Sequence, residues 1–501
     1  MFKSLIEHQP LKAETNSILQ DDEASAFPQE VEKLLQNNIL LSFVPNSLGG
    51  KMGSVEDTLH MGRLLSRRNL TAAIALGQTL LGSLPVWLYG SETQKKELTE
   101  VLKKGGLNCL ALTEEENGSD LSMTKVSDTN GVINGKKWCI NNATKGRALS
   151  VLTLGEGGVL NVHLILKDKA HQGSFTNISK INTLGIRGAD ISGIIFDHFS
   201  QQDSLIGRAG QGQEIILKTM QISRLLCASF SLGAADTTLR RALEFTSSRI
   251  LYGKEALHIP AVKFKLQECY RKLLLIEAFA IMCSRFVTMI PEVMSLYSAI
   301  SKYYVTKLSD EIIQSATEVI GARFYIRDSD FGITQKMMRD HRVVSLFDGN
   351  SDVNMSIIAG QLKRLAQIPP LKDDTKFIYN LKNPAPDFTG DEKLRLTNRG
   401  RDIIWEAQTD KDLLNKREAL FTKVNGVSDI QSPEMLTLVE EYCALTLKAN
   451  YQLFHFYNHQ DFSIQVDIDK MMNDENLDIA LPLDQLQKKC LFSHFHCEIN
   501  D

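Results

Sequence analysis

The hydrophobic period of this chain changes twice, and these changes restrict its fold more than any other feature. Up to about residue 105, apolar residues recur at helical spacing, as they do from Val55 to Ser66. Between residues 106 and 205 the apolar runs are short, β-rich and separated by Gly, Asn and Asp. Helical spacing returns from Gln211 to Leu365. This order predicts a mostly helical α+β protein with a small β-domain in the middle.

Four regions follow from this pattern and from the length of 501 residues, which is too long for one ordinary core. We expect an N-terminal helical domain (1–105), a small middle β-barrel domain (106–205), a four-helix bundle (206–367) and a mostly helical C-terminal extension (371–501), with Pro369-Pro370 as the last boundary. Long helices are predicted from Glu214 to Arg249, Ala261 to Thr288, Glu292 to Ile320 and Glu434 to Tyr457. A buried helix is expected from Leu70 to Leu84, with Pro85 after it.

The stretch from Cys109 to Asn142 contains two predicted strands on either side of a turn-rich polar loop. The second strand is entered through Asn134-Gly135, and an Asn-Gly pair between apolar alternations is a strong hairpin signal. We therefore expect a β-hairpin in this stretch.

Composition excludes several classes of function. A net charge of −4 gives no electrostatic reason to expect nucleic-acid binding. No apolar run approaches 18 residues, so we expect no membrane-spanning helix and no membrane contact. The eight cysteines are scattered without a Cys-x-x-Cys pair, which predicts reduced thiols, a cytoplasmic protein and no metal site. The His-rich tail from Leu491 to Cys497 is expected to be a packed terminus rather than a zinc site.

Several motifs, taken in order, resemble those of the acyl-CoA dehydrogenase family. The first pairs Leu112-Thr113-Glu114 and Gly118-Ser119-Asp120 with Asn134-Gly135-Lys136-Lys137. The later ones are Leu184-Gly185-Ile186-Arg187-Gly188, Gly210-Gln211-Gly212, Ser223-Arg224, Arg249 with Tyr252-Gly253-Lys254, Met338-Arg339-Asp340 and Phe347-Asp348-Gly349-Asn350. Each motif is weak alone, but their joint order over residues 25 to 365 is specific.

The resemblance implies FAD-dependent α,β-dehydrogenation of an acyl thioester, in which a carboxylate removes the α-proton and flavin N5 accepts the β-hydride. The family's usual base is a Glu, and the matching position here is Asp348, one methylene shorter. The other reading of Asp348 is an ordinary Asp-Gly turn residue. Some relatives carry the base on the bundle helix, but the matching stretch from Gln221 to Arg224 has no carboxylate.

The resemblance also assigns binding residues. Those implied for FAD are Leu112, Thr113, Ser119, Cys139, Asn141, Arg249, Asn350 and Asp352, and those implied for substrate are Ser119, Arg224 and Gly349. Several positions depart from the family pattern. Among them, Cys139 stands where a Trp stacks on the flavin, and Asn141 replaces the Thr that bonds N5. Glu318 and Asp352 add negative charge near the pyrophosphate, which is unfavourable unless it is paired.

Partners are implied only in class. The substrate would be carried by CoA or by an acyl carrier protein, and the electron acceptor stays open. The extension resembles that of very-long-chain members, which predicts a homodimer. Two alternatives remain, an oxidase of the same fold and a catalytically inactive assembly or carrier-binding protein.

Overall fold

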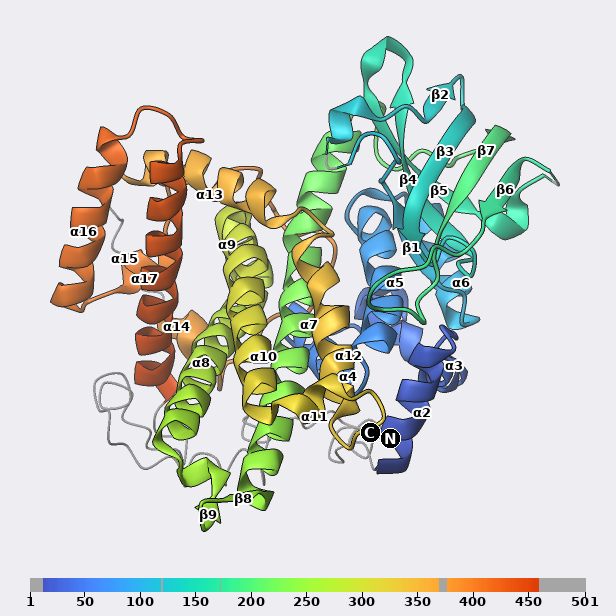
Figure 1. The fold of residues 1–501 in the computed structure, drawn as a ribbon. Coiled ribbons are helices and arrows are strands. Elements are labelled where there is room, and N and C mark those ends of the chain that lie inside the picture. Colours follow the sequence, from blue (N-terminus) through green and yellow to red (C-terminus); the bar gives the residue numbers. More distant parts are fainter. Residues whose placement is uncertain (1–11, 119, 172, 369–375, 459–501) are drawn as a thin grey trace.

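The computed structural model describes residues 12–118, 120–171, 173–368 and 376–458. These residues form a mostly helical protein with one small mixed sheet (Figure 1), so the predicted fold class is confirmed. Three sequence predictions fall outside the described residues, namely the site residue Ser119, the boundary at Pro369-Pro370 and the His-rich tail.

Helices of the N-terminal part pack against the first long helix of the bundle, α7. α4 begins with a capping box, in which the Ser54 hydroxyl accepts a hydrogen bond from the Asp57 backbone N–H and the Asp57 carboxylate accepts one from Ser54. The elements are α2 (Lys12–Glu23), α3 (Gln29–Gln36), η1 (Ile39–Phe43), η2 (Asn46–Leu48), α4 (Val55–Arg68), α5 (Leu70–Tyr89) and α6 (Glu92–Lys103).

The structure corrects two expectations, that a helix ends before Pro85 and that no apolar segment is long enough to span a membrane. α5 does not stop before Pro85 but continues to Tyr89, because the buried residues Leu84, Val86 and Trp87 keep its last turns packed in the core. By length and composition, α5 and α7 would be long and apolar enough to cross a membrane, and the bent pair Pro260–Met289 with Pro291–Ile320 would be a third candidate. Of the most apolar 18-residue windows, 100% is buried in α5 and 83% in α7, so this apolar surface packs inside the fold.

The middle part is one seven-stranded sheet in the order β1-β4-β2-β3-β7-β6, with β5 also paired to β4. β4 runs parallel to β1 and β2, and the other pairs are antiparallel. Among the described strands no ladder joins β5 to β6, so the expected barrel is an open sheet in its pairing. The strands are β1 (Asn108–Ala111), β2 (Ser127–Thr129), β3 (Val132–Asn141), β4 (Ala148–Gly155), β5 (Leu160–Leu166), β6 (Phe175–Ile178) and β7 (Ile191–Ser200).

The hairpin exists, but its turn is Asn130-Gly131 rather than Asn134-Gly135. Asn130 and Gly131 have φ angles of 51° and 78° and connect β2 to β3, as expected for the positive-φ turn that suits a two-residue hairpin. Gly135 lies inside β3 at a register shift against β7. With φ at 129°, a Cβ on Gly135 would stand 3.0 Å from Val126 Cα, so this irregularity requires glycine.

The bundle follows, and α7 (Gly212–Ser248) and α8 (Pro260–Met289) match two of the predicted helices. The expected single helix from Glu292 to Ile320 is broken at a π-helical turn, η8 (Ser301–Val305). The elements are α7 (Gly212–Ser248), β8 (Ile250–Leu251), β9 (Lys254–Glu255), α8 (Pro260–Met289), α9 (Met294–Ile300), η8, α10 (Thr306–Ile320), α11 (Ala322–Tyr325), α12 (Gly332–His341), η9 (Arg342–Ser345) and α13 (Ser351–Leu365).

The C-terminal region packs on the outer side of the bundle, through contacts of α17 with α8 and α13 (Figure 1). Buried Asp402 fastens it, because its carboxylate accepts hydrogen bonds from Tyr297 Oη at 2.6 Å and Tyr442 Oη at 2.8 Å. Gln221 Nε2 on α7 also donates to the Arg395 carbonyl at 2.7 Å. The helices are α14 (Lys376–Tyr379), α15 (Ile403–Ala407), α16 (Lys411–Gly426) and α17 (Pro433–Asn458).

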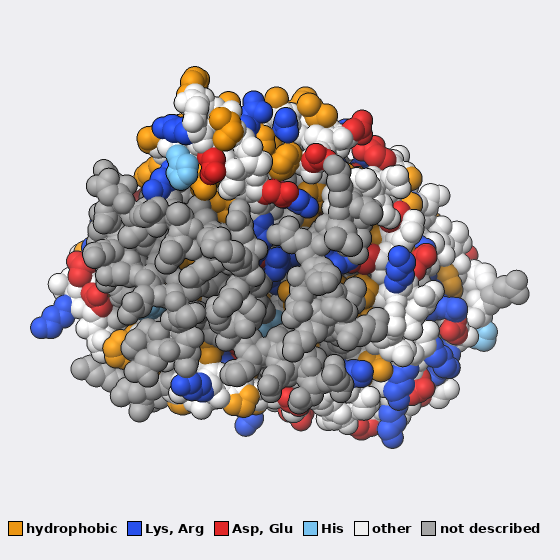
Figure 2. All heavy atoms as spheres, turned by 90° about the horizontal axis from the view of Figure 1, so that it is seen from below, with side chains coloured by type: hydrophobic (Ala, Val, Ile, Leu, Met, Phe, Trp, Pro, Cys, Tyr) orange, Lys and Arg blue, Asp and Glu red, His pale blue; other side chains and the backbone are white. Residues whose placement is uncertain are grey.

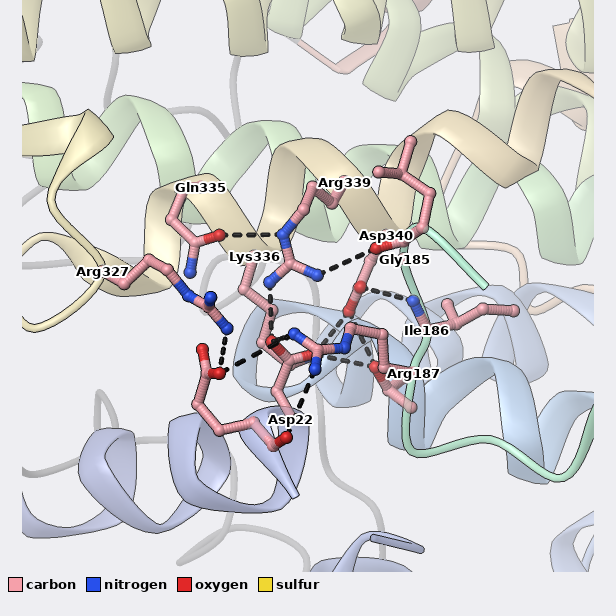
Figure 3. Close-up of polar contacts among 12 residues, drawn as sticks. Asp22, Gly185, Ile186, Arg187, Arg327, Gln335, Lys336, Arg339 and Asp340 are labelled. Atoms are coloured by element: carbon pink, nitrogen blue, oxygen red, sulfur yellow. Dashed lines mark hydrogen bonds and ion pairs between the residues drawn. The ribbon is translucent and has the colours of Figure 1, made fainter. Parts of the chain in front are cut away.

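Asp340 on α12 joins three parts of the chain (Figure 3). Its Oδ1 accepts the Ile186 backbone N–H at 2.6 Å, and its Oδ2 accepts the Thr71 hydroxyl at 2.7 Å and the Lys336 ammonium. Gly185 must be glycine, since a Cβ there would lie 2.1 Å from the Arg339 carbonyl oxygen. The two motifs therefore meet although Ile186 and Asp340 are 154 residues apart, and this contact fixes the bundle segment that leads to Asp348.

The surface seen from below mixes charges of both signs. In Figure 2, Lys and Arg side chains and Asp and Glu side chains both occur on this face. This face matches the near balance of the whole chain, whose net charge is −4.

Candidate active site

The loop between η9 and α13 presents the candidate base in an unusual backbone conformation. Asp348 and Gly349 are consecutive left-handed residues, with φ angles of 58° and 82°. Asp tolerates this region better than most residues, because its short polar side chain can bond locally. Asn350 then caps α13, with its Oδ1 accepting the Val353 backbone N–H at 2.9 Å. The loop is therefore fixed on both sides of the carboxylate.

The two oxygens of the Asp348 carboxylate differ in their surroundings. Oδ2 accepts the Ser223 hydroxyl at 2.7 Å and the Cys227 thiol at 3.5 Å, both from α7. Oδ1 is buried and has no hydrogen-bond partner in the protein. Some of the Asp348 residue remains accessible, but its Oδ1 does not. An unpaired buried oxygen is costly for a purely structural residue, so this oxygen is the one available to a reacting group.

Burial raises the pKa of Asp348 above its usual value. The Ser223 hydrogen bond, the Arg224 guanidinium, the Lys302 ammonium and the Cys227 thiol oppose this rise. The result is a carboxylate that is a stronger base than an exposed Asp, which is the property that general-base chemistry requires.

The structure brings the predicted substrate residues Arg224 and Gly349 to the same place. Arg224 is 3% exposed, and its Nη2 lies 3.5 Å from where a Cβ on Gly349 would stand. Its Nε is buried without a partner. A cation with free hydrogen-bonding capacity beside the base is suited to hold a polar group of a ligand.

The predicted flavin-facing loop at the end of β1 is held firmly from β3. Lys137 Nζ donates to the Leu112 carbonyl at 2.9 Å and to Glu114 Oε1 at 2.7 Å, while the Trp138 N–H donates to the Thr113 carbonyl at 3.0 Å. Lys137 is fully buried, and burial lowers its pKa to about 8 although Glu114 opposes the shift. The loop therefore has a fixed shape before any ligand binds.

Asn141 on β3 is a candidate to hydrogen-bond a ligand. It is 8% exposed, and both its Nδ2 and its Oδ1 are buried without a partner. Cys139 on the same strand is exposed, with φ at 58° at a second register shift. The neighbouring Asn142 donates to the Ala75 carbonyl on α5 at 2.7 Å, and α5 packs on α7. Of the two positions that depart from the family pattern, Cys139 is therefore accessible and Asn141 has an amide that no protein group bonds.

Arg249 lies away from this cluster within one chain. It follows the last residue of α7, roughly 40 Å along the helix from Ser223 at 1.5 Å per residue. Its guanidinium stands 5.7 Å from the Phe245 ring centroid and is exposed. Within one chain, Arg249 therefore lies at the far end of α7 from Ser223 and Asp348.

The two acidic departures have different outcomes. Glu318 is paired with Lys265 at 2.6 Å, so its charge is compensated. Asp352 is exposed in the first turn of α13, where the helix dipole stabilises a negative charge. Neither residue places an unpaired buried carboxylate near a pyrophosphate.

Sequence reasoning missed three neighbours of Asp348. Ser223 and Cys227 bond its Oδ2, and Lys302 lies on the π-helical turn η8. Ser223 and Cys227 are four residues apart on α7, so they lie on the same face of the helix. This spacing is the signal in the sequence that could have predicted that they act together. Lys302 gave no usable signal, because a lysine in an amphipathic run reads as a solvated residue. Among the described residues, no group of three His, Cys, Asp or Glu side chains is arranged to hold a metal.

Comparison with known proteins identifies relatives of both the β-domain and the bundle. Family profiles match residues 109–199, as "Acyl-CoA dehydrogenase, middle domain", and residues 210–363, as "Acyl-CoA dehydrogenase, C-terminal domain". The human mitochondrial short-chain specific acyl-CoA dehydrogenase is 26% identical over 362 residues, which cover 69% of this chain and 85% of the relative.

Solved structures agree on the fold. The acyl-CoA dehydrogenase of Bacillus anthracis, solved in complex with FAD, superposes with a TM-score of 0.71 at 18% identity and covers 92% of this chain and 80% of its own. A prolyl acyl carrier protein oxidase superposes with a TM-score of 0.63 at 19% identity, covering 68% of this chain and 92% of its own. The first of these likenesses extends over most of the C-terminal region, beyond the residues that the family profiles match.

Proposed function

Because this chain belongs to the acyl-CoA dehydrogenase family, we propose that it catalyses the FAD-dependent α,β-dehydrogenation of an acyl thioester with Asp348 as the base. The observation that carries the proposal is the state of the Asp348 carboxylate, which is buried, raised in pKa and unpartnered at Oδ1. A buried, basic carboxylate oxygen without a protein partner is able to accept a proton from a bound substrate.

The proton transfer uses the difference between the two carboxylate oxygens. Ser223 and Cys227 hold Oδ2, which fixes the plane of the carboxylate, and Oδ1 takes the α-proton of the thioester. Burial makes Asp348 more basic and excludes water that would otherwise solvate it. The left-handed backbone at Asp348 and Gly349 sets the direction in which the carboxylate leaves the loop.

FAD would supply the acceptor for the β-hydride. The residues of this chain that would hold it are the Leu112-Thr113 loop at one edge, Cys139 against the ring and the Asn141 amide at a ring nitrogen. Asn350 keeps its Nδ2 free while its Oδ1 caps α13. The resemblance assigns Arg249 to the pyrophosphate of a partner subunit, and its exposed position at the end of α7 is compatible with a homodimer.

The substrate is proposed only as a class. Arg224 and Gly349 would contact the thioester end, and either CoA or a carrier protein could deliver it. The similar prolyl acyl carrier protein oxidase makes a carrier-bound substrate and oxygen as the acceptor a variant worth testing beside acyl-CoA with another acceptor.

The test is an anaerobic absorbance titration of the purified protein. We expect a flavin spectrum that bleaches when one class of acyl-CoA, or an acyl carrier protein, is added. Admission of air would then separate an oxidase, which regains its colour quickly, from a dehydrogenase. Absence of flavin after reconstitution with FAD would overturn the proposal and favour a non-catalytic assembly or carrier-binding protein.

A further inference from the structure

Lys302 is a buried cation at the break between α9 and α10. It is 2% exposed and lies on the π-helical turn η8. Such turns are rare and insert an extra residue into a helix, so that side chains after the insertion point in a new direction. Burial of an ammonium group is unfavourable in free energy unless other groups bond it or balance its charge, so the contacts of Lys302 indicate its role.

The ammonium contacts the segment that leads directly to the base. Lys302 Nζ donates a hydrogen bond to the Val344 carbonyl and stands 5.3 Å from the Phe347 ring centroid. Val344 is fully buried in η9, and Phe347 immediately precedes Asp348. One side chain therefore holds both the start and the end of the turn that carries the carboxylate.

The charged groups around this contact come from three elements. α7 contributes Arg224 and the Cys227 thiol, α10 contributes Asp310, and the loop contributes Asp348. Asp310 is already engaged, because its carboxylate is 2.6 Å from His341 Nδ1 and 3.7 Å from Arg342 Nη1. Burial lowers the pKa of Lys302, and Cys227, Asp348 and Asp310 oppose this shift.

We propose that Lys302 is a positioning residue for Asp348, which holds the turn from Val344 to Phe347 and brings a buried positive charge to the segment that carries the base. This role rests on the proposed function, since it assumes that Asp348 is the base. It adds a residue from η8 to a site otherwise built by α7, the β-domain and the loop before α13. The π-helical turn would then have a role, because it carries Lys302 at the point where this side chain contacts the loop.

Two variants separate the charge from the hydrogen bond. Lys302→Met removes both, whereas Lys302→Gln keeps an N–H donor for the Val344 carbonyl. The measurement is the rate of flavin bleaching as a function of pH. Without the cation, the midpoint of the acidic limb moves to higher pH in both variants, and the rate below it falls about tenfold for each unit of movement. Only Lys302→Met should also lower the limiting rate at high pH.

Lys307→Met is the matched control. Lys307 lies one and a half turns further along the chain, and its ammonium is 2.8 Å from Glu440 on α17. Its removal deletes a cation of the same kind without touching the loop, so the midpoint should stay in place. An unmoved midpoint in folded Lys302→Gln, or an equal movement in Lys307→Met, would overturn the proposal.

A readout without catalysis separates this inference from the proposed function. The free energy of unfolding at pH 7 is measured for Lys302→Gln, Asp348→Asn and the double variant. A favourable interaction between the two side chains gives a non-zero coupling energy in this cycle. Coupling without flavin bleaching in the unaltered protein would contradict the proposed function alone. Bleaching without coupling would contradict the role of Lys302 alone.

Discussion

Two aspartates on one segment of the chain, Asp340 and Asp348, have opposite relations to their surroundings. Both carboxylates are buried. Both oxygens of Asp340 are bonded, by the Ile186 N–H on one side and by Thr71 and Lys336 on the other. Asp348 has bonds on Oδ2 alone, and its Oδ1 is left without a partner.

The difference shows that one segment contains both a residue that connects parts of the fold, Asp340, and a candidate catalytic residue, Asp348. Asp340 is satisfied by three parts of the chain, so its role is complete in the folded protein without a ligand (Figure 3). Asp348 keeps an unbonded oxygen and a raised pKa. Both are unfavourable for folding, so interactions elsewhere in the fold must offset them. The joint at Asp340 fixes the end of α12, from which the chain reaches the Asp348 loop through η9.

The largest effect is expected from Asp348→Asn. Asn accepts a left-handed backbone as readily as Asp and keeps the side-chain volume, so the fold and the flavin content should be unchanged. Loss of the base should lower the rate of flavin bleaching by about 10²–10⁴-fold. Rapid-mixing absorbance measures this rate, and full turnover in the variant would remove Asp348 from the mechanism.

Asp340→Asn should act on stability instead. It leaves the buried Lys336 ammonium without its carboxylate, and breaking a buried pair costs about 3–5 kcal/mol of the free energy of unfolding. Denaturant titration measures the loss. Asp391→Asn, at an exposed aspartate, is the control and should stay within about 0.5 kcal/mol. A small effect at Asp340 would contradict its place as a joint.

Asp348→Glu probes how closely the loop fits the shorter acid. The added methylene has to enter the space between Ser223 and Cys227, and Glu is less suited than Asp to φ at 58°. We expect the bleaching rate to fall by about 10²-fold, because displacement by about 1 Å has that effect at a reacting centre. A faster variant would show that the loop still suits the longer side chain.

The smallest effect is the dependence of stability on pH. A carboxyl whose pKa is raised on folding favours the folded state at low pH, and this contribution is lost as pH rises through the folded-state pKa. Asp348→Asn should therefore be slightly more stable than the unaltered protein at pH 8. The difference should vanish below the ordinary Asp value of 3.8, where Asp348 is neutral in both states. Thermal unfolding at several pH values measures this difference. If the fold stabilised the carboxylate, Asp348→Asn would instead be less stable than the unaltered protein at pH 8.

Local patterns in the sequence predicted the main helices and strands. They were wrong about a hairpin turn, a helix break and a helix end, whose positions depend on tertiary contacts. The stretch from Thr129 to Lys136 contains two Asn-Gly pairs, and pairing of β3 with β7 determined that Asn130-Gly131 makes the turn. The apolar spacing from Glu292 to Ile320 is continuous, so it contained no sign of the π-helical turn at Lys302. Pro85 looked like a helix end, and the buried residues around it kept the helix going.

The sequence by itself determined the order of helices and strands, the family resemblance and Asp348 as the candidate base, because these depend on period, on residue type and on motifs read along the chain. Tertiary structure decided what the candidate residues do. Ser223 bonds Asp348 across 125 residues, and Lys302 reaches the same loop from a separate helix. Which oxygen stays free, and which amide stays unpartnered at Asn141, depends on burial and distance in three dimensions. No local pattern encodes these quantities, since each is set by side chains that only the completed fold brings together.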